Sequence, residues 1–88
     1  MEIQLKLYGS SKILSDKEIL HIYLPKNSNI EELRNVLSKI ISEKSLKNNL
    51  QNLPSTAAFF SESNEVISDK YKLKDKEQIS IIPPIGGG

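Results

Sequence analysis

The fold is decided by the stretch Ile79-Ser80-Ile81-Ile82-Pro83-Pro84-Ile85-Gly86-Gly87-Gly88, in which a β-type apolar run meets two prolines. Proline has no backbone N–H and holds φ at about −65°, so a strand that reaches Pro83 ends there. We therefore predict a last strand from Gln78 to Ile82 and an extended tail over residues 83–88. Six extended residues reach on the order of 20 Å at about 3.3–3.6 Å each, so the tail is long enough to enter the active site of a partner.

The composition predicts one small globular domain. The 88 residues are 38% hydrophobic and 26% charged, which is too apolar for a disordered chain. The formal charge of +1 creates no strong field, so we expect neither nucleic acid nor a membrane as a partner. The chain has no cysteine, which excludes disulfides and thiolate nucleophiles. It shows neither a signal-peptide pattern nor an apolar run of ~20 residues, so we expect the cytosol.

Two strands are predicted in the first part of the chain. Residues 3–7 alternate between apolar and polar side chains, which is the period of a strand with one buried face. Residues 20–24 alternate in the same way until Pro25. Between the two strands, Gly9-Ser10-Ser11 and the residues up to Glu18 are expected to form a loop.

One amphipathic helix is predicted from Ile30 to about Lys44. Asn29 is placed to cap this helix, and Glu32 stands three positions later, where it completes a capping box. Arg34 falls outside the apolar stripe and is assigned to another side of the helix. The residues of the apolar stripe are Ile30, Leu33, Val36, Leu37, Ile40 and Ile41.

The remaining elements are shorter. Leucine spacing over residues 46–53 suggests a short helical piece that ends before Pro54. A strand is predicted from Thr56 to Phe60, with both phenylalanines assigned to the core, and an edge strand at Val66-Ile67. This order of elements describes a two-layer α+β domain of residues 1–82, followed by the tail of residues 83–88.

In element order and in motif, the chain resembles the ubiquitin-like β-grasp sulfur carriers, and within them the small subunit of molybdopterin synthase. The matching motifs are Leu73-Lys74-Asp75 and Pro83-Pro84-Ile85-Gly86-Gly87-Gly88, which fits a family ending of Pro-Pro-aliphatic-x-Gly-Gly. The resemblance implies an α+β β-grasp fold, with a mixed sheet of four to five strands covered on one face by a helix. The chain departs from the family at Asp75-Lys76-Glu77-Gln78, where Asp-Gly-Asp-Glu is common. If this turn needs a positive φ, Lys76 is strained where glycine is not.

The resemblance also implies a carrier cycle in which the chain itself binds no cofactor. An adenylating activating enzyme consumes ATP to activate the carboxylate of Gly88, and a sulfur donor protein then converts the adenylate into a thiocarboxylate. The large, catalytic subunit of molybdopterin synthase directs this sulfur at a cyclic pterin precursor. Gly86 and Gly87 are assigned to threading the tail into a narrow channel. Pro83, Pro84 and Ile85 are assigned to partner binding.

Three alternatives stay open at this point. The same carrier chemistry serves other acceptors, namely thiamine thiazole or thiolated tRNA, although the diproline argues against the thiamine carriers. A ubiquitin-like modifier would join Gly88 to a target lysine through an isopeptide bond. A β-grasp interaction module with an inert tail would tolerate an additional residue after Gly88.

No other residue pattern predicts catalysis. His21 is the only histidine and has no partner pattern of a catalytic or metal site, so it is assigned to a strand surface. Phosphate-binding glycine loops, metal-ligand spacings and acid–base pairs are absent from the sequence, so we expect no enzymatic activity of the chain alone. A solvated face is the preferred interpretation of the alternating lysines, with a docking patch for an acidic partner as the minority one. These lysines are Lys70, Lys72, Lys74 and Lys76.

Overall fold

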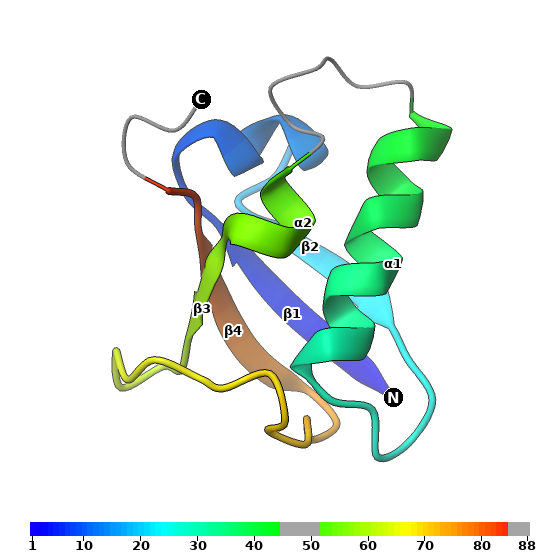
Figure 1. Cartoon of the computed structure of the whole chain (residues 1–88), viewed down its shortest axis with the longest axis vertical. Helices are drawn as coiled ribbons and strands as arrows, with labels where there is room; N and C mark the ends of the chain where they lie inside the picture. The colour runs from blue at the N-terminus through cyan, green and yellow to red at the C-terminus, as the bar shows by residue number, and fades with distance from the viewer. Residues whose placement is uncertain (45–51, 85–88) are drawn as a thin grey trace.

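The computed structural model describes residues 1–44 and 52–84, which form two layers, a mixed sheet and a helix that lies across one of its faces (Figure 1). The elements are β1 (Glu2–Leu7), the 3₁₀ helix η1 (Gly9–Leu14), β2 (Ile19–Tyr23), α1 (Ile30–Glu43), α2 (Leu53–Thr56), β3 (Ala58–Phe60) and β4 (Glu77–Ile82). Neither α1 nor the shorter helices of these segments is long and apolar enough to cross a bilayer.

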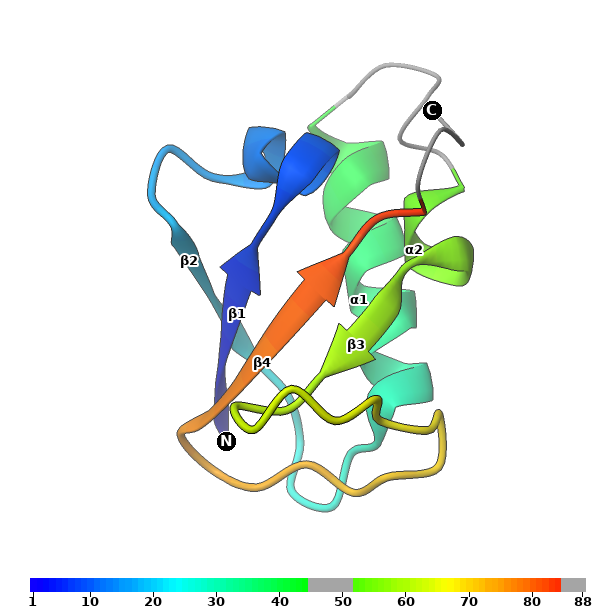
Figure 2. The ribbon, with the colours of Figure 1, turned by 90° about the vertical axis from the view of Figure 1, so that its left-hand side faces the viewer.

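The sheet has four strands in the order β2-β1-β4-β3, which Figure 2 shows from left to right with α1 behind them. β1 pairs antiparallel with β2 and parallel with β4, and in this register Leu5 faces Leu20 on one side and Ile79 on the other. β3 pairs antiparallel with β4, with Ala58 opposite Ile82. A parallel pair needs a crossover connection, and α1 lies in that crossover. The structure therefore confirms the predicted α+β, β-grasp class with four strands.

Helix α1 begins where the sequence places its cap. Glu32 N donates to Asn29 Oδ1 at 3.0 Å, and Asn29 N donates to Glu32 Oε1 at 3.4 Å, so the capping box is formed. The predicted stripe faces the sheet, with Val36 and Ile40 partly buried at its border. The fully or almost fully buried members of the stripe are Ile30, Leu33, Leu37 and Ile41.

The connection between β1 and β2 differs from the predicted loop, because residues 9–14 form the helix η1. Ser11 is fully buried and closes its first turn: Tyr8 N donates to Ser11 Oγ at 2.9 Å, and Ser11 Oγ donates to Tyr8 O. Local side-chain bonds of this kind give the backbone an alternative to a strand or an open loop. Leu14, at the end of η1, is buried in the core.

The segment before β3 also differs from the prediction. Most of the helical piece proposed for residues 46–53 lies outside the described residues, and α2 begins at Leu53, where that piece was expected to end. Pro54 stands in the first turn of α2, where its missing N–H has no helical partner to lose. Thr56 was predicted to begin the next strand, but it is the last residue of α2, and β3 begins at Ala58.

Within residues 52–84, the edge strand predicted at Val66-Ile67 does not form. Val66 makes only an isolated bridge with Phe60, and Ile67 N donates to Phe59 O at 2.8 Å. Phe59 is buried, as predicted, whereas Phe60 is only partly buried because it lies on the other face of β3. The prediction that both phenylalanines belong to the core is therefore wrong for Phe60.

The turn before β4 has a positive φ at Lys76, the position where the resembled family commonly has glycine. Lys76 has φ 66°, in the left-handed region that favours glycine. Asp75 Oδ1 accepts a bond from Glu2 N at 2.8 Å, and Lys76 N donates to Glu2 O at 2.7 Å. These bonds hold the turn against β1 although the residue at its centre is not glycine.

Candidate functional site at the root of the tail

The predicted tail starts from the interior of the sheet. β4 lies between β1 and β3, and it ends at Ile82, directly before Pro83. Pro83 is partly buried and Pro84 is exposed, so the chain leaves the sheet at these two residues, as predicted. Ile85, Gly86, Gly87 and Gly88 lie outside the described residues, and their roles stay predictions.

Pro83 lies close to Gly9, the first residue of η1. Gly9 has φ +56°, and a Cβ placed on it would lie 3.6 Å from Pro83 Cγ and 3.8 Å from Pro83 Cδ. A larger side chain at this position would meet the ring, and any L-residue would be strained by the backbone angle. From the sequence, Gly9 was assigned only to the loop that follows the first strand. Its second role follows from the parallel pairing of β1 and β4, which brings the ends of both strands to the same edge of the sheet.

A small apolar surface surrounds this exit on the face of the sheet that α1 leaves open. Ala58 is the register partner of Ile82, and Phe60 is the partner of Ser80, so their side chains share that face. Tyr8 follows Leu7, whose register partner is Ile81, and the Tyr8 side chain is 38% exposed. We name this set the tail-root surface; it consists of Tyr8, Ala58, Phe60, Ile82 and Pro83.

Tyr8 and Phe60 were not predicted from the sequence as members of the site. The signal that identifies them is their parity: Tyr8 has the parity of the outward residues of β1, and Phe60 has the parity opposite to the buried Phe59. Val66, which bridges to Phe60, is 70% exposed and extends the apolar character beyond β3. A single exposed apolar residue needs no explanation, but a group that surrounds the start of the tail is a candidate docking surface.

Charged groups lie on the same open face toward the other end of the strands. Glu2 accepts from Lys76 Nζ at 2.8 Å and contacts His21 Nδ1 at 2.5 Å. The hydrogen bond from Lys76, followed by that from His21, holds the pKa of Glu2 below its usual value. The same contact raises the pKa of Lys76. His21 is exposed on β2, as predicted, and its acidic neighbour gives it a structural contact rather than a catalytic one.

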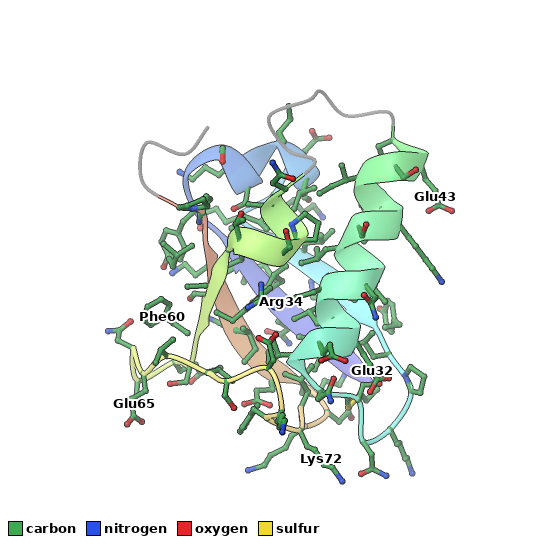
Figure 3. All side chains as sticks on the ribbon, viewed as in Figure 1. Glu32, Arg34, Glu43, Phe60, Glu65 and Lys72 are labelled. Atoms are coloured by element: carbon green, nitrogen blue, oxygen red, sulfur yellow. The ribbon has the colours of Figure 1, made fainter. Side chains whose placement is uncertain are left out.

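The lysines of residues 70–76 are exposed, in agreement with the preferred interpretation of a solvated face. Figure 3 labels Lys72 at the end of the molecule that lies opposite the tail root. The minority interpretation, a docking patch for an acidic partner, has no structural support beyond this exposure.

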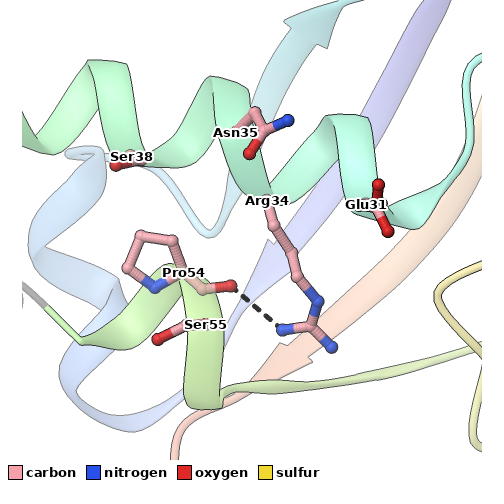
Figure 4. Close-up of a pocket in the computed structure, with 6 residues that line it drawn as sticks. All are labelled: Glu31, Arg34, Asn35, Ser38, Pro54 and Ser55. Carbon is pink, nitrogen blue, oxygen red and sulfur yellow. Dashed lines mark hydrogen bonds between the residues drawn. The ribbon is translucent and has the colours of Figure 1, made fainter.

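A second polar site, between α1 and α2, is structural. The groove has a volume of about 260 Å³, and Figure 4 shows Arg34 reaching across it to the backbone of α2. Arg34 Nη1 donates to Pro54 O at 3.0 Å and to Ala57 O at 2.8 Å, while Nε and Nη2 donate to Asp69 Oδ1 at 3.1 and 3.0 Å. Arg34 lies outside the apolar stripe, as predicted, but its contacts with α2 and Asp69 were not predicted from the sequence. Within residues 1–44 and 52–84, no group of three or more potential ligand side chains is arranged to hold a metal.

Comparison of the structure with solved structures identifies the fold. Putative molybdopterin converting factor subunit 1 of Pyrococcus furiosus superposes with a TM-score of 0.70 at 15% identity, over 96% of this chain and 98% of that chain. A complex of subunits 1 and 2 of molybdopterin-converting factor from Helicobacter pylori 26695 contains a chain that matches with a TM-score of 0.62 at 25% identity, over 100% of both chains. The chain has the ubiquitin-like β-grasp fold of these subunits.

The same fold is present in a protein modifier. Small archaeal modifier protein 1 of Haloferax volcanii matches with a TM-score of 0.68 at 9% identity, over 96% of this chain and 98% of that chain. No protein-family model and no curated protein matches the sequence. The comparisons therefore confirm the predicted molybdopterin-synthase-like, ubiquitin-related fold, which sulfur carriers and ubiquitin-like modifiers share.

Proposed function

We propose that this protein is the sulfur carrier subunit of a molybdopterin synthase. The observation that carries the proposal is the exit of Pro83-Pro84 from the central strand β4, beside an apolar surface and directly before Ile85-Gly86-Gly87-Gly88. The Helicobacter pylori complex of subunits 1 and 2 supports the choice of pathway, because its match is 25% identical over both whole chains.

The proposed chemistry requires a free α-carboxylate on Gly88. An α-carboxyl group with a pKa of about 3.3–3.7 is ionised at neutral pH. In the active site of an activating enzyme, one carboxylate oxygen attacks the α-phosphorus of ATP, and pyrophosphate leaves. The terminal sulfur of a persulfide on a donor protein then attacks the acyl carbon, and AMP leaves. A thiol cleaves the resulting acyl disulfide, so that a thiocarboxylate is released on Gly88 and the thiol and the donor sulfur form a disulfide. That sulfur passes to a cyclic pterin precursor in the catalytic subunit.

In this proposal the body of the domain supplies recognition and the partner supplies catalysis. The tail-root surface docks on the large subunit and on the activating enzyme, while Pro83, Pro84 and Ile85 guide the tail into their channels. Gly86 and Gly87 keep the channel-bound segment free of side chains next to the reacting carboxyl group. We place the reaction in the cytosol, and the chain needs no bound cofactor.

Mass spectrometry of the intact chain tests the proposal directly. Incubation with ATP, an activating enzyme and a sulfur donor should replace one oxygen of Gly88 by sulfur, and the modified residue should be located in the C-terminal peptide. A variant with alanine appended after Gly88 is the matched control. An unchanged mass, under conditions in which an established carrier is fully charged, contradicts the proposal.

Docking at the tail-root surface has a separate test. Phe60→Ser should weaken binding to the large subunit, because Phe60 lies beside the exit of the tail, while Val66→Ser changes a more exposed apolar residue beyond it. A typical interface hot spot contributes 2 kcal/mol or more, so we expect a loss of affinity of about 30-fold for Phe60→Ser. Equal affinities of the two variants would exclude the surface as the docking site.

A ubiquitin-like modifier is the second candidate, because small archaeal modifier protein 1 shares the fold over nearly the whole chain. Both candidates begin with adenylation, so the products discriminate between them. Conjugates of this chain that survive reduction and denaturation would favour the modifier. A labile thiocarboxylate without such conjugates favours the carrier.

Acceptors outside molybdenum cofactor synthesis require a genetic test. Complementation of strains that lack the carrier for molybdopterin, for thiamine thiazole or for tRNA thiolation separates the three pathways. We expect restored molybdoenzyme activity and no rescue of the other two strains.

A further inference from the structure

Along the outer edge of β2, the outward-facing backbone N–H and C=O groups have no backbone hydrogen-bond partner among the described residues. Leu24 and Met1 exchange both N–H···O bonds, at 2.9 and 2.7 Å, and Leu7 N donates to Glu18 O at 2.9 Å. Because hydrogen-bonded pairs alternate along an antiparallel ladder, Leu20 and Ile22 also bond toward β1. The N–H and C=O groups of the intervening residues, Ile19, His21 and Tyr23, therefore point away from β1. Residues 1–44 and 52–84 supply no backbone hydrogen bond to them.

The outward N–H and C=O groups of one β2 edge can pair with those of the β2 edge of a second copy. Two copies of β2 in antiparallel orientation, with His21 opposite His21, place Ile19 of each copy opposite Tyr23 of the other. In that register every outward N–H faces an outward C=O, which gives a ladder without unpaired ends; a shift along the strand leaves groups without partners. We propose that this protein forms a twofold-symmetric dimer through its β2 edges, which joins the two sheets into one of eight strands.

The side chains agree with this register. β2 contains neither lysine nor proline, the residues that protect an edge strand from association. In the dimer, Ile19 would contact Tyr23, a favourable aliphatic–aromatic cross-strand pair, and Tyr23 is 72% exposed in the single chain. Beyond the ladder, the exposed Asp16 of one copy would come opposite the exposed Lys26 of the other, so the flanking charges are complementary as well.

The helix face beside β2 provides further apolar contact area. Arg34 and Asn35 lie against α2, on the β3 side of α1, so the residues on the opposite flank of α1 face β2. Val36 and Ile40 occupy that flank and, like Leu20 on β2, are only partly buried. A twofold axis perpendicular to the sheet leaves both α1 helices on the same face. The two sets of partly buried aliphatic side chains then face each other across the axis.

The dimer is compatible with the carrier role and does not depend on it. β4 is separated from β2 by β1, so the tail root lies away from the joined edges (Figure 2). Because the two β2 strands run in opposite directions, the two tails leave at opposite ends of the assembly. Each tail can then enter a separate partner.

Single cysteines map the axis, because the chain has no cysteine of its own. Cα atoms of a directly opposed antiparallel pair are about 5.5 Å apart, within the range of a disulfide, whereas position 19 lies about 14 Å from its own copy. With oxidised glutathione as the oxidant, His21→Cys should form a disulfide-linked dimer. Two further positions of β2 serve as controls, Ile19→Cys and Tyr23→Cys, together with Ser63→Cys in an exposed loop. These three variants should form disulfide-linked dimers only at the rate of random collision. Equal rates at all four positions, or none at His21→Cys, would overturn the proposal.

A charge exchange gives an independent readout. Ile19→Lys with Tyr23→Lys places like charges opposite each other across the axis, and sedimentation should show the loss of the concentration-dependent dimer of the natural chain. Ile19→Glu with Tyr23→Lys places opposite charges there, and should restore dimers at low salt. Within one copy, position 19 faces Lys6 and position 23 faces Glu2, so the restoring pair is also compatible with the folded chain. A natural chain that stays monomeric at all concentrations, or two variants with the same dimer fraction, would refute the interface.

Discussion

Replacement of Arg34 by methionine should destabilise the domain far more than its position on a helix suggests. The side chain is 18% exposed, and its guanidinium carbon lies 4.8 Å from the centroid of the Phe59 ring. Methionine keeps most of the stem that packs on this ring and removes the charged donors. The change therefore removes the hydrogen bonds, the ion pair and the charge over the ring, and keeps most of the apolar packing.

The magnitude follows from the partners that are lost. Two charge-assisted bonds to the carbonyl oxygens of Pro54 and Ala57 contribute about 1.5 kcal/mol each, because Ala57 is buried and water cannot replace the donor there. The ion pair with Asp69, whose side chain is 50% exposed, contributes at most about 1 kcal/mol, and the contact with the ring about 0.5–1 kcal/mol. The free energy of unfolding should fall by about 3.5–5 kcal/mol in total.

Urea denaturation of Arg34→Met and Asp69→Asn, followed by circular dichroism, checks this ranking. Asp69→Asn removes the ion pair and leaves the carbonyl bonds, so it should lower the free energy of unfolding by about 1 kcal/mol or less. Arg34→Met should also lower the melting temperature by more than about 10 °C. If the two variants are equally destabilised, the ion pair rather than the carbonyl bonds joins α1 to α2, and the reasoning is wrong.

Three further predictions concern the tail and the turn before β4. Alanine appended after Gly88 should abolish sulfur loading and change the free energy of unfolding by less than about 0.5 kcal/mol; a loss of stability in urea would contradict it. Lys76→Gly should be more stable than Lys76→Ala by about 1 kcal/mol, the reverse of the usual order, because φ is 66°; equal urea midpoints would refute the strain. The lowered pKa of Glu2 stabilises the fold above the ordinary carboxyl pKa of 4.5, so the stability difference between the natural chain and Glu2→Gln should disappear as the pH falls below that value. A difference that persists at pH 2 would exclude this linkage.

The elements that were predicted correctly are those with a local signal. Alternation identified β1 and β2, and the capping pair Asn29 and Glu32 located the start of α1 to the residue. The diproline located the end of β4. In each case the deciding residues are adjacent in the sequence, and the favourable local conformation agrees with the one that the core requires.

The features that were missed depend on partners far along the chain. Arg34 was assigned only to a side of α1 outside the apolar stripe, and its acceptors Pro54 O and Ala57 O, 20 and 23 residues later, were not predicted. The predicted edge strand at Val66-Ile67 does not form, because no adjacent pair extends the bridge between Val66 and Phe60 into a ladder. Helix η1 depends on the burial of Ser11, and sequence patterning treats a serine after glycine as a turn residue. Within the candidate site, the strand end and the exit at Pro83 were predictable, and the neighbouring Tyr8 and Phe60 required the sheet register.

The position of β4 in the sheet suits the proposed role, in which the tail is delivered to partner proteins. A tail attached to an edge strand could be pulled off the sheet together with that strand, because only one ladder holds it. β4 instead pairs with β1 over five register positions and with β3 over three, and its side chains Ile79 and Ile81 are fully buried. Strands with such contacts open only with a free energy close to that of global unfolding. In the proposed carrier role, the force of threading would therefore act on the best-held strand of the sheet, and the fold would stay unchanged while a partner binds the tail.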